Sequence, residues 1–244
     1  AIAVTEAMKS VYPRSGPILD VLAGAYYQLG LLEKAIANFE EAIRLGDDLI
    51  APVDLAFVYL NAGRIGDAKE LANKVRATDS LALRALLFQI AFLEGDAAAL
   101  ERQVEWARGR PDELFMLQNR SYAAAFQGRI REARDFNRRA IELAQAREMP
   151  EAAVDFAVTM ARTEALMGNC RQALEATTAV LAQQVDWQTL ARAAMALAIC
   201  GEAERAESIA DEIVRRVPQG TLANELWLPT LRACMGIAHR DAQS

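Results

Sequence analysis

The chain has 244 residues, of which 53% are hydrophobic and 25% are charged, and its formal net charge is −6. The negative charge argues against general binding of nucleic acid, whose affinity comes largely from cationic contacts with phosphate. Even the apolar stretch Leu81–Leu93 contains Arg84, so we expect no membrane span and no membrane contact by this segment. The single histidine, His239, can complete neither a nucleophile–base pair nor a histidine metal site. We therefore expect a protein that is not an enzyme and that needs no cofactor or metal.

Six glycines recur almost evenly along the chain, at Gly30, Gly63, Gly95, Gly128, Gly168 and Gly201. Four of the intervals are 32 or 33 residues, and the interval before Gly168 is 40. An alanine stands five residues after every one of these glycines except Gly95. A period of about 34 with small residues at fixed offsets is typical of stacked helix–turn–helix units. The spacing predicts an all-α, right-handed superhelical solenoid, built as a single array of about six helix pairs over residues 1–244.

The chain opens on half a helix pair and then gives its clearest unit. Residues 1–11, which precede Tyr12-Pro13, align with a second helix, so we expect this chain to be a piece of a longer protein. In the unit 19–45, apolar residues recur with helical spacing on both sides of the turn glycine. Ala23 and Ala35 leave room for the two helices of this unit to approach each other. The unit closely resembles the tetratricopeptide repeat.

The middle of the chain keeps this pattern with two departures. The unit 81–107 has Phe88 and Leu100 where small residues are usual, which predicts a wider separation of its two helices. The 40-residue interval adds about two helical turns. We expect these turns to be shared between the helix ending near Arg147 and the helix starting near Pro150. The remaining full units are expected near 53–75, 114–141 and 190–217.

The last segment, Leu222–His239, has the pattern of a first helix whose partner is missing, and Pro229 within it should kink the helix. Its apolar residues are Leu222, Leu226, Leu231, Met235 and Ile237. A solenoid end without a polar cap exposes apolar area, and such area promotes association. We therefore predict a homodimer through Leu222–His239, with twofold symmetry because this is the commonest.

Some short strings go beyond the generic repeat. They are Val11–Arg14, Leu93–Asp96 with Glu101–Gln103, and Trp227–Ala233. As a set they resemble the C-terminal repeat region of bacterial eukaryotic-like serine/threonine protein kinases, and similar regions follow the winged-helix domain of some bacterial transcription regulators. The phosphate-binding and catalytic loops of a kinase are absent from the sequence. The resemblance therefore implies the sensing or docking part of a bacterial signalling protein.

First helices line the inner surface of such a superhelix, so their side chains form the expected groove for a protein or peptide ligand. Aromatic and amide side chains alternate there, which suits a peptide held by apolar contacts and hydrogen bonds. The basic clamp that grips acidic peptide C-termini in the repeat family needs several Lys or Arg, and only Arg162 qualifies. The alternative is that these rings only pack between adjacent helices. The predicted groove residues are Tyr27, Gln28, Phe57, Asn61, Gln89, Phe92, Gln118, Tyr122, Phe126 and Arg162.

One run of arginines is the marked charge feature of the chain. Arg131, Arg134 and Arg138 share one helix face by their spacing, which is the pattern of a phosphate-binding stripe. Glu132 and Asp135 lie among them, and pairing on the helix surface is the interpretation that we favour.

The cysteines offer little chemistry. Cys170, Cys200 and Cys234 are widely spaced and form no Cys-x-x-Cys pair. We expect each to pack as a small buried hydrophobe, without a role in metal binding or redox chemistry.

Three kinds of function fit these patterns. The leading hypothesis is a non-catalytic protein-interaction region, and the alternatives are a small-molecule-sensing solenoid and an oligomerisation element. The sequence favours the cytoplasm, with the periplasm as the alternative if the parent protein has a membrane span before this segment. Neither the ligand nor the parent protein follows from the sequence.

Overall fold

The computed structural model describes residues 2–46, 50–75 and 79–241, with backbone alone for 238–241. These ranges contain helices and no β-strand, which confirms the all-α repeat fold. The helices are α1 (Ile2–Val11), α2 (Gly16–Gln28), α3 (Leu32–Leu45), α4 (Ala51–Asn61), α5 (Ile65–Lys74), α6 (Leu81–Glu94), α7 (Ala97–Ala107), α8 (Glu113–Phe126), α9 (Ile130–Ala146), α10 (Pro150–Leu166), α11 (Cys170–Leu181), α12 (Trp187–Ile199), α13 (Ala203–Arg216), the π-helical turn η1 (Ala223–Trp227) and α14 (Leu228–Asp241).

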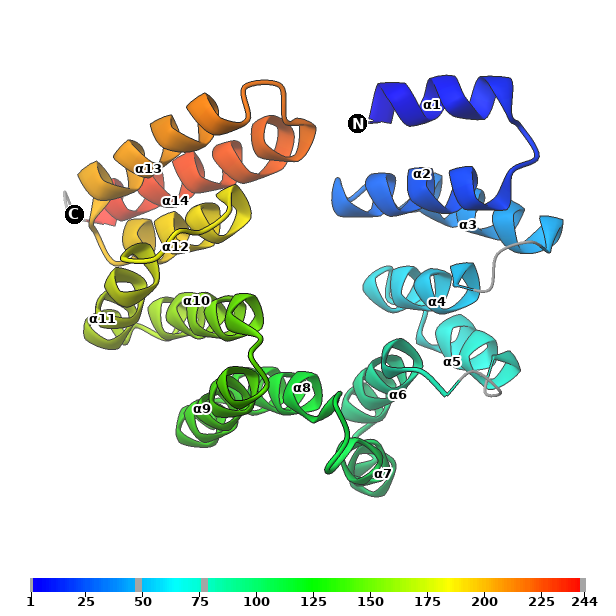
Figure 1. The fold of residues 1–244 in the computed structure, drawn as a ribbon, viewed down its shortest axis with the longest axis horizontal. Coiled ribbons are helices and arrows are strands. Elements are labelled where there is room, and N and C mark those ends of the chain that lie inside the picture. The colour runs from blue at the N-terminus through cyan, green and yellow to red at the C-terminus, as the bar shows by residue number, and fades with distance from the viewer. Residues whose placement is uncertain (1, 47–49, 76–78, 242–244) are drawn as a thin grey trace. The chain divides into compact units, whose positions relative to one another are not determined.

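Two compact units divide the chain, the N-terminal unit Ala1–Asp112 and the C-terminal unit Glu113–Ser244. In the N-terminal unit, α4 and α6 lie on one side and α5 and α7 on the other (Figure 1). In the C-terminal unit, α8, α10 and α12 lie on one side and α9, α11 and α13 on the other. We call the even-numbered helices from α2 to α12 first helices, and the odd-numbered ones second helices. A single right-handed array over the whole chain stays a prediction.

Some helix starts show why they begin where they do. Pro17, Pro52 and Pro150 lie in the first turn of α2, α4 and α10, where the N–H that proline lacks would have no helical partner. Asp96 caps α7 by accepting a hydrogen bond from the N–H of Ala99 at 2.8 Å.

The six recurrent glycines end the first helices as predicted. All of them have φ between 70° and 84°, a left-handed conformation that costs glycine little because it has no Cβ. At Gly30 the chain reverses with a hydrogen bond from the Leu31 N–H to the Tyr26 carbonyl at 2.9 Å. The periodic glycines therefore place one tight turn in each predicted helix pair.

Small residues then allow the paired helices to pack closely. Ala23 and Ala35 have no exposed surface, and Phe39 is 2% exposed beside them in the core of the first pair. In the third pair, Phe88 is buried and Leu100 is half-buried. The burial of these first-pair residues supports the resemblance of this unit to the tetratricopeptide repeat.

The N-terminal helix α1 occupies the place of a second helix, as predicted. Tyr26 on α2 donates a hydrogen bond to Glu6 on α1 at 2.5 Å, and Tyr59 on α4 donates one to Glu40 on α3 at 2.8 Å. The same contact in successive pairs makes α1 the counterpart of α3.

The long interval between glycines extends two helices, which confirms the expectation. Both α9 and α10 have 17 residues. The turn between them places Glu148 at φ 55°, in the left-handed region that disfavours residues with a Cβ.

The last segment differs from its prediction. The π-helical turn η1 runs directly into α14, and Pro229 is the second residue of α14, so the irregularity lies within one continuous helical run. Proline has no N–H for the carbonyl four residues earlier, and the wider pairing of a π-turn accommodates that loss. Leu231 and Met235 pack inward against α12 and α13 at 0% and 8% exposure, so they do not belong to an open apolar face. The side chain of His239 lies outside the described residues.

The cysteine prediction is wrong for two residues. Cys170 and Cys200 form a disulfide across 30 residues, with their Cα atoms 5.3 Å apart. Cys170 begins α11 and Cys200 follows α12, so the bond links the turns of two successive helix pairs. Cys234 is free and half-buried.

Candidate functional site

Three predicted groove residues meet on α2 and α4 of the N-terminal unit. The Asn61 amide donates hydrogen bonds to Tyr27 Oη and to the Phe57 carbonyl, both at 2.9 Å. Burial raises the pKa of Tyr27, against a smaller lowering by the Asn61 hydrogen bond. Gln28 is exposed beside Tyr27. The structure thus fixes Tyr27 in a polar contact between adjacent first helices, and Gln28 keeps an open side chain.

Two further predicted residues lie on α6. Gln89 and Phe92 are both half-buried, and their three-residue spacing puts them on one helix face. Their burial fits packing between neighbouring first helices as well as ligand contact. Neither interpretation is tested by the structure.

In the C-terminal unit the predicted residues differ sharply in exposure. Gln118, Tyr122 and Phe126 follow one another at four-residue spacing on one face of α8. Tyr122 is 44% exposed and Phe126 is 81% exposed. Gln118 is only 7% exposed, and its Oε1 accepts no hydrogen bond within the described part of the chain. A buried amide oxygen beside exposed rings is the arrangement a ligand N–H would complete.

Arg162 lies on α10, the next first helix, and its side chain is half-buried. Its Nε is buried and has no hydrogen-bond acceptor among the described residues. Nearby on the same helix face, Asp155 accepts a hydrogen bond from Arg192 of α12 at 2.5 Å. This ion pair was not predicted from sequence. Its signal was the position of Asp155, seven residues before Arg162, which places both side chains on one face of α10.

An apolar edge runs along the ends of the same first helices. It consists of the residues two before each turn glycine, namely Phe126, Leu166 and Ile199. Leu166 is 66% exposed and Ile199 is half-buried. Of these three residues, only Phe126 is among the groove residues predicted from sequence.

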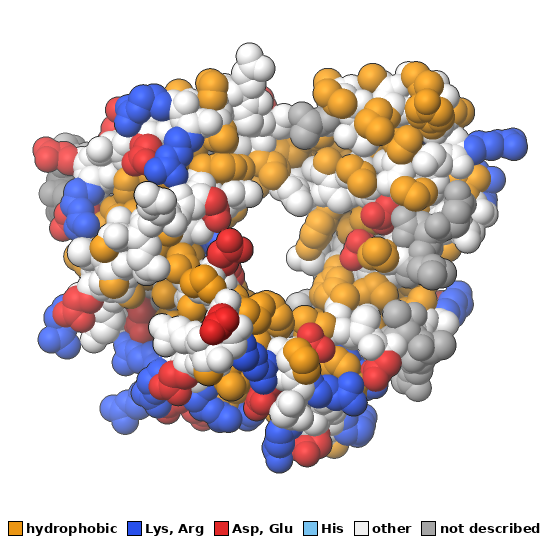
Figure 2. Space-filling model, viewed as in Figure 1, with side chains coloured by type: hydrophobic (Ala, Val, Ile, Leu, Met, Phe, Trp, Pro, Cys, Tyr) orange, Lys and Arg blue, Asp and Glu red, His pale blue; other side chains and the backbone are white. Residues whose placement is uncertain are grey.

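Charge is distributed differently on the two sides of the C-terminal unit. Arg side chains, with Asp and Glu among them, gather over the second helices, whereas hydrophobic side chains extend along the first helices (Figure 2). Two of the three arginines of the predicted stripe are paired, since Arg134 bonds Glu164 at 2.5 and 2.8 Å and Arg138 bonds Asp135 at 2.8 Å. These ion pairs support the pairing interpretation over a phosphate-binding stripe.

The described residues contain neither a metal site nor a membrane-spanning helix. Residues 2–46, 50–75 and 79–241 bring together no group of three His, Cys, Asp or Glu side chains that could hold a metal ion. Over the same ranges, no helix combines the length and hydropathy that crossing a membrane requires.

Comparison with known proteins supports the repeat assignment. Residues 17–45, which cover most of α2 and all of α3, match the tetratricopeptide repeat family. No curated protein matches the sequence. The resemblance to the repeat region of bacterial kinases is not shown by these comparisons and stays a prediction.

Several solved structures share the fold. Human IFIT1, in a dimer with PPP-AAAA, is 15% identical with a TM-score of 0.58, over 100% of this chain and 60% of that one. A chain of the APC/C hetero-tetramer Cut9–Hcn1 is 10% identical with a TM-score of 0.55, over 97% and 45%. A signal transduction ATPase with a tetratricopeptide repeat sensor from Pyrococcus horikoshii is 17% identical with a TM-score of 0.52, over 93% and 41%. The chain thus spans about half the length of these structures, and the likeness shows the fold alone.

Proposed function

We propose that this chain is a non-catalytic protein-interaction scaffold that binds a peptide on the first-helix side of its C-terminal unit. The observation that carries the proposal is the Gln118 Oε1 atom, which is buried without a donor beside the exposed rings of Tyr122 and Phe126. Leaving a buried acceptor unpaired costs about 1–3 kcal/mol. A peptide that turns this amide outward would give its oxygen an N–H donor and recover the cost, while the rings bury apolar area.

The surrounding residues favour a peptide with an apolar segment. Phe126, Leu166 and Ile199 supply a hydrophobic edge. Arg162 adds one cation, whereas the guanidinium of Arg192 is already paired with Asp155. A ligand held mainly by acidic groups therefore fits less well than one held by apolar contacts and backbone hydrogen bonds. In this proposal Tyr27, Asn61, Gln89 and Phe92 of the N-terminal unit have packing roles.

The test separates binding from folding at Gln118. Peptides selected from a random display library against the whole chain provide the ligand. In Gln118→Met, which keeps the volume and removes the amide, we expect the free protein to melt at a higher temperature because no acceptor is left unpaired. The same change should weaken binding of the selected peptide about tenfold, by the loss of one hydrogen bond to a buried partner.

Tyr122→Ala provides a second measurement, with an expected loss of about 2 kcal/mol or more in binding if this ring is a hot spot. Tyr12→Ala, which removes a 60% exposed ring from the N-terminal unit, is the matched control and should leave affinity unchanged. Unchanged affinity in both Gln118→Met and Tyr122→Ala would refute this location for the site.

We further propose that the chain is the docking region of a bacterial signalling kinase or transcription regulator. The support is the set of strings Val11–Arg14, Leu93–Asp96 with Glu101–Gln103, and Trp227–Ala233. The reading frame upstream of Ala1 decides the matter. A kinase or winged-helix domain there is the expected result, and any other domain would contradict it.

The homodimer also remains a proposal, with a smaller surface than the sequence indicated. Of the apolar residues in Leu222–His239, Leu226 and Ile237 are the exposed ones, at 37% and 65%. We expect Ile237→Glu to convert a dimer to a monomer in sedimentation experiments while melting at the same temperature. A chain that is monomeric before the substitution would contradict this proposal.

A further inference from the structure

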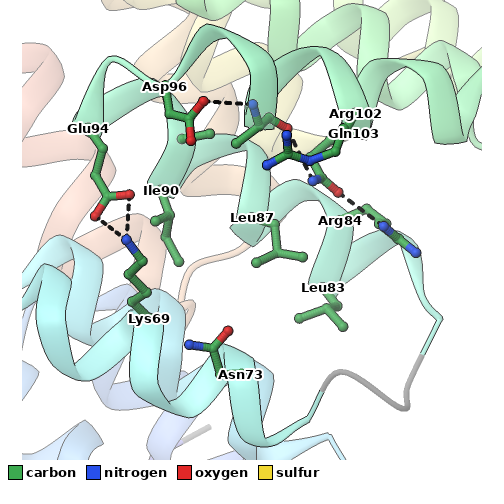
Figure 3. A pocket seen from close by; sticks show the side chains of 12 residues that line it. Lys69, Asn73, Leu83, Arg84, Leu87, Ile90, Glu94, Asp96, Arg102 and Gln103 are labelled. Carbon is green, nitrogen blue, oxygen red and sulfur yellow. Dashed lines mark hydrogen bonds and ion pairs between the residues drawn. The ribbon is translucent and has the colours of Figure 1, made fainter.

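A separate cavity lies in the N-terminal unit, away from the proposed peptide site. Its volume is about 450 Å³, and it opens between α5 and α7 with α6 as its floor (Figure 3). Leu83, Leu87 and Ile90 line that floor at spacings of four and three residues, as a row along one face of α6. The volume is within the range of small-molecule sites.

The cavity lies beside a short second helix. α5 has only 10 residues, whereas α9, its counterpart in the fourth pair, has 17. The cavity lies where this short helix faces α6, whose lining residues Leu83 and Ile90 are 2% and 4% exposed. The bulky Phe88 and Leu100 lie in the same pair, where the sequence predicts a wider separation of helices.

Most charged groups around the cavity are already engaged. Lys69 bonds both carboxylate oxygens of Glu94 at 2.7 and 2.8 Å. Arg84 bonds Asp79 at 2.8 Å and Gln103 at 3.3 Å. The Asp96 carboxylate at the rim accepts the Ala99 N–H, and the positive end of the α7 dipole offsets its charge.

Two polar side chains on opposite walls are not engaged. Asn73 of α5 and Arg102 of α7 line the cavity, with Leu87 and Ile90 lying between them in the view of Figure 3. Neither side chain makes a hydrogen bond or ion pair within the ranges 2–46, 50–75 and 79–241. The cavity thus combines an aliphatic floor with one exposed cation and one exposed amide, neither of which has a partner among the described residues.

We propose that this cavity binds a small aliphatic monocarboxylate. Its carboxylate would accept hydrogen bonds from the Arg102 guanidinium, for which a planar carboxylate is the matching acceptor, and the Asn73 amide is a further donor. Its alkyl chain would lie along Leu83, Leu87 and Ile90, where burial of apolar area is favourable. No aromatic ring lines the cavity among its described residues, so an alkyl chain fits better than an aromatic body.

Trp106 provides a local reporter for this binding. Its ring centroid lies 5.1 Å from the guanidinium carbon of Arg84, a residue of the cavity wall. The chain has three tryptophans, so the double variant Trp187→Phe/Trp227→Phe leaves Trp106 as the sole emitter. The probes are octanoate and octan-1-ol, which share an alkyl chain and differ in the charged group.

We expect octanoate to change Trp106 emission at millimolar concentration or below, and to bind about tenfold more tightly than octan-1-ol. Arg102→Gln should remove that preference and leave octan-1-ol binding unchanged. Arg108→Gln is the matched control, because Arg108 lies just past the same helix and is paired with Glu105. Ala99→Leu, which fills the cavity, should abolish binding of both probes while circular dichroism shows an intact fold.

Three results would overturn the proposal. They are equal affinity for octanoate and octan-1-ol, octanoate binding that survives Arg102→Gln, and no response to octanoate at millimolar concentration in either emission or calorimetry. None of these bears on the peptide site of the C-terminal unit, so the two proposals fail separately.

Discussion

The two units fasten successive helix pairs at an equivalent place with different chemistry. In the N-terminal unit, Tyr59 stands four residues before a turn glycine and donates a hydrogen bond to the Glu40 carboxylate on the preceding second helix. In the C-terminal unit, the residue four before Gly168 is Glu164, and it accepts hydrogen bonds from Arg134 on the preceding second helix. In these pairs the residue at this repeat position reaches back to the neighbouring helix as a phenol or a carboxylate, whereas Ala91, Ala124 and Leu197 stand there in other pairs. The choice sets which conditions weaken each unit.

The largest expected effect separates the units by redox state. Reduction of the Cys170–Cys200 bond should destabilise the C-terminal unit by about 3–4 kcal/mol, the value for a closed loop of this length. Urea unfolding followed by Trp187 and Trp227, which pack against the core of that unit, should shift to lower midpoints with reductant. The transition reported by Trp106 should not move. Cys234→Ser, which removes the free thiol, is the control. A shift of the urea midpoint at all three tryptophans would count against independent unfolding of the two units.

The next effect breaks the ion pair of the C-terminal unit. Glu164 is 3% exposed, so Arg134→Met leaves a buried carboxylate with Asn169 as its remaining hydrogen-bond donor. We expect a loss of about 2 kcal/mol in the free energy of unfolding, below the usual value for buried pairs because Arg134 is 37% exposed. Arg138→Met, at an exposed pair on the same helix, should cost about 0–1 kcal/mol. Equal costs in the two variants would show that burial of Glu164 is unimportant.

The N-terminal unit should instead be sensitive to alkali. Burial, with the Glu40 hydrogen bond, raises the pKa of Tyr59 to about 12, and the hydrogen bond to Glu6 raises the pKa of Tyr26. An unfolded tyrosine loses its proton near pH 10, so the stabilisation is complete below pH 10 and falls as the pH rises to about 12. We expect a loss of about 1–2 kcal/mol over that range, followed by Trp106 emission during urea unfolding. Tyr59→Phe should flatten this dependence; a Tyr59→Phe profile as steep as that of the parent chain would contradict the assignment.

The smallest effect concerns the turn between α9 and α10. Glu148 has φ 55°, and glycine adopts this conformation with little strain. Glu148→Gly should therefore raise the stability of the C-terminal unit by about 0.5–1 kcal/mol, after the greater freedom of glycine in the unfolded chain is counted. Thermal melting measures the change. A lower melting temperature would mean that the Glu148 side chain has a stabilising role.

The sequence predicted the turns and the closely packed positions because both depend on one residue at a time. A left-handed turn favours glycine, and close approach of two helices favours alanine, so Gly30 and Ala35 carry their structural meaning locally. The disulfide depends on two turns meeting in space. Its signal was present, since Cys170 follows Gly168 by two residues and Cys200 precedes Gly201 by one, which places both beside adjacent turns.

The candidate sites were only partly predictable for the same reason. Tyr27 and Asn61 were both selected from the positions before their turn glycines, but Tyr27 stands three residues before Gly30 and Asn61 two before Gly63, and their hydrogen bond was not predicted. Leu231 was counted as part of an open apolar face, whereas it packs inward against α12 and α13. The cavity over α6 faces the short helix α5, and helix ends are harder to predict from sequence than the periodic residues between them.

The disulfide also changes how the chain would respond to mechanical tension. Residues between Cys170 and Cys200 form a covalently closed loop, so a force applied at the chain ends cannot straighten them. At about 3.3–3.6 Å per residue, the bond withholds roughly 100 Å of contour length. Under oxidising conditions the fully stretched chain would therefore be shorter by that amount, and the two turns joined by the disulfide would stay together.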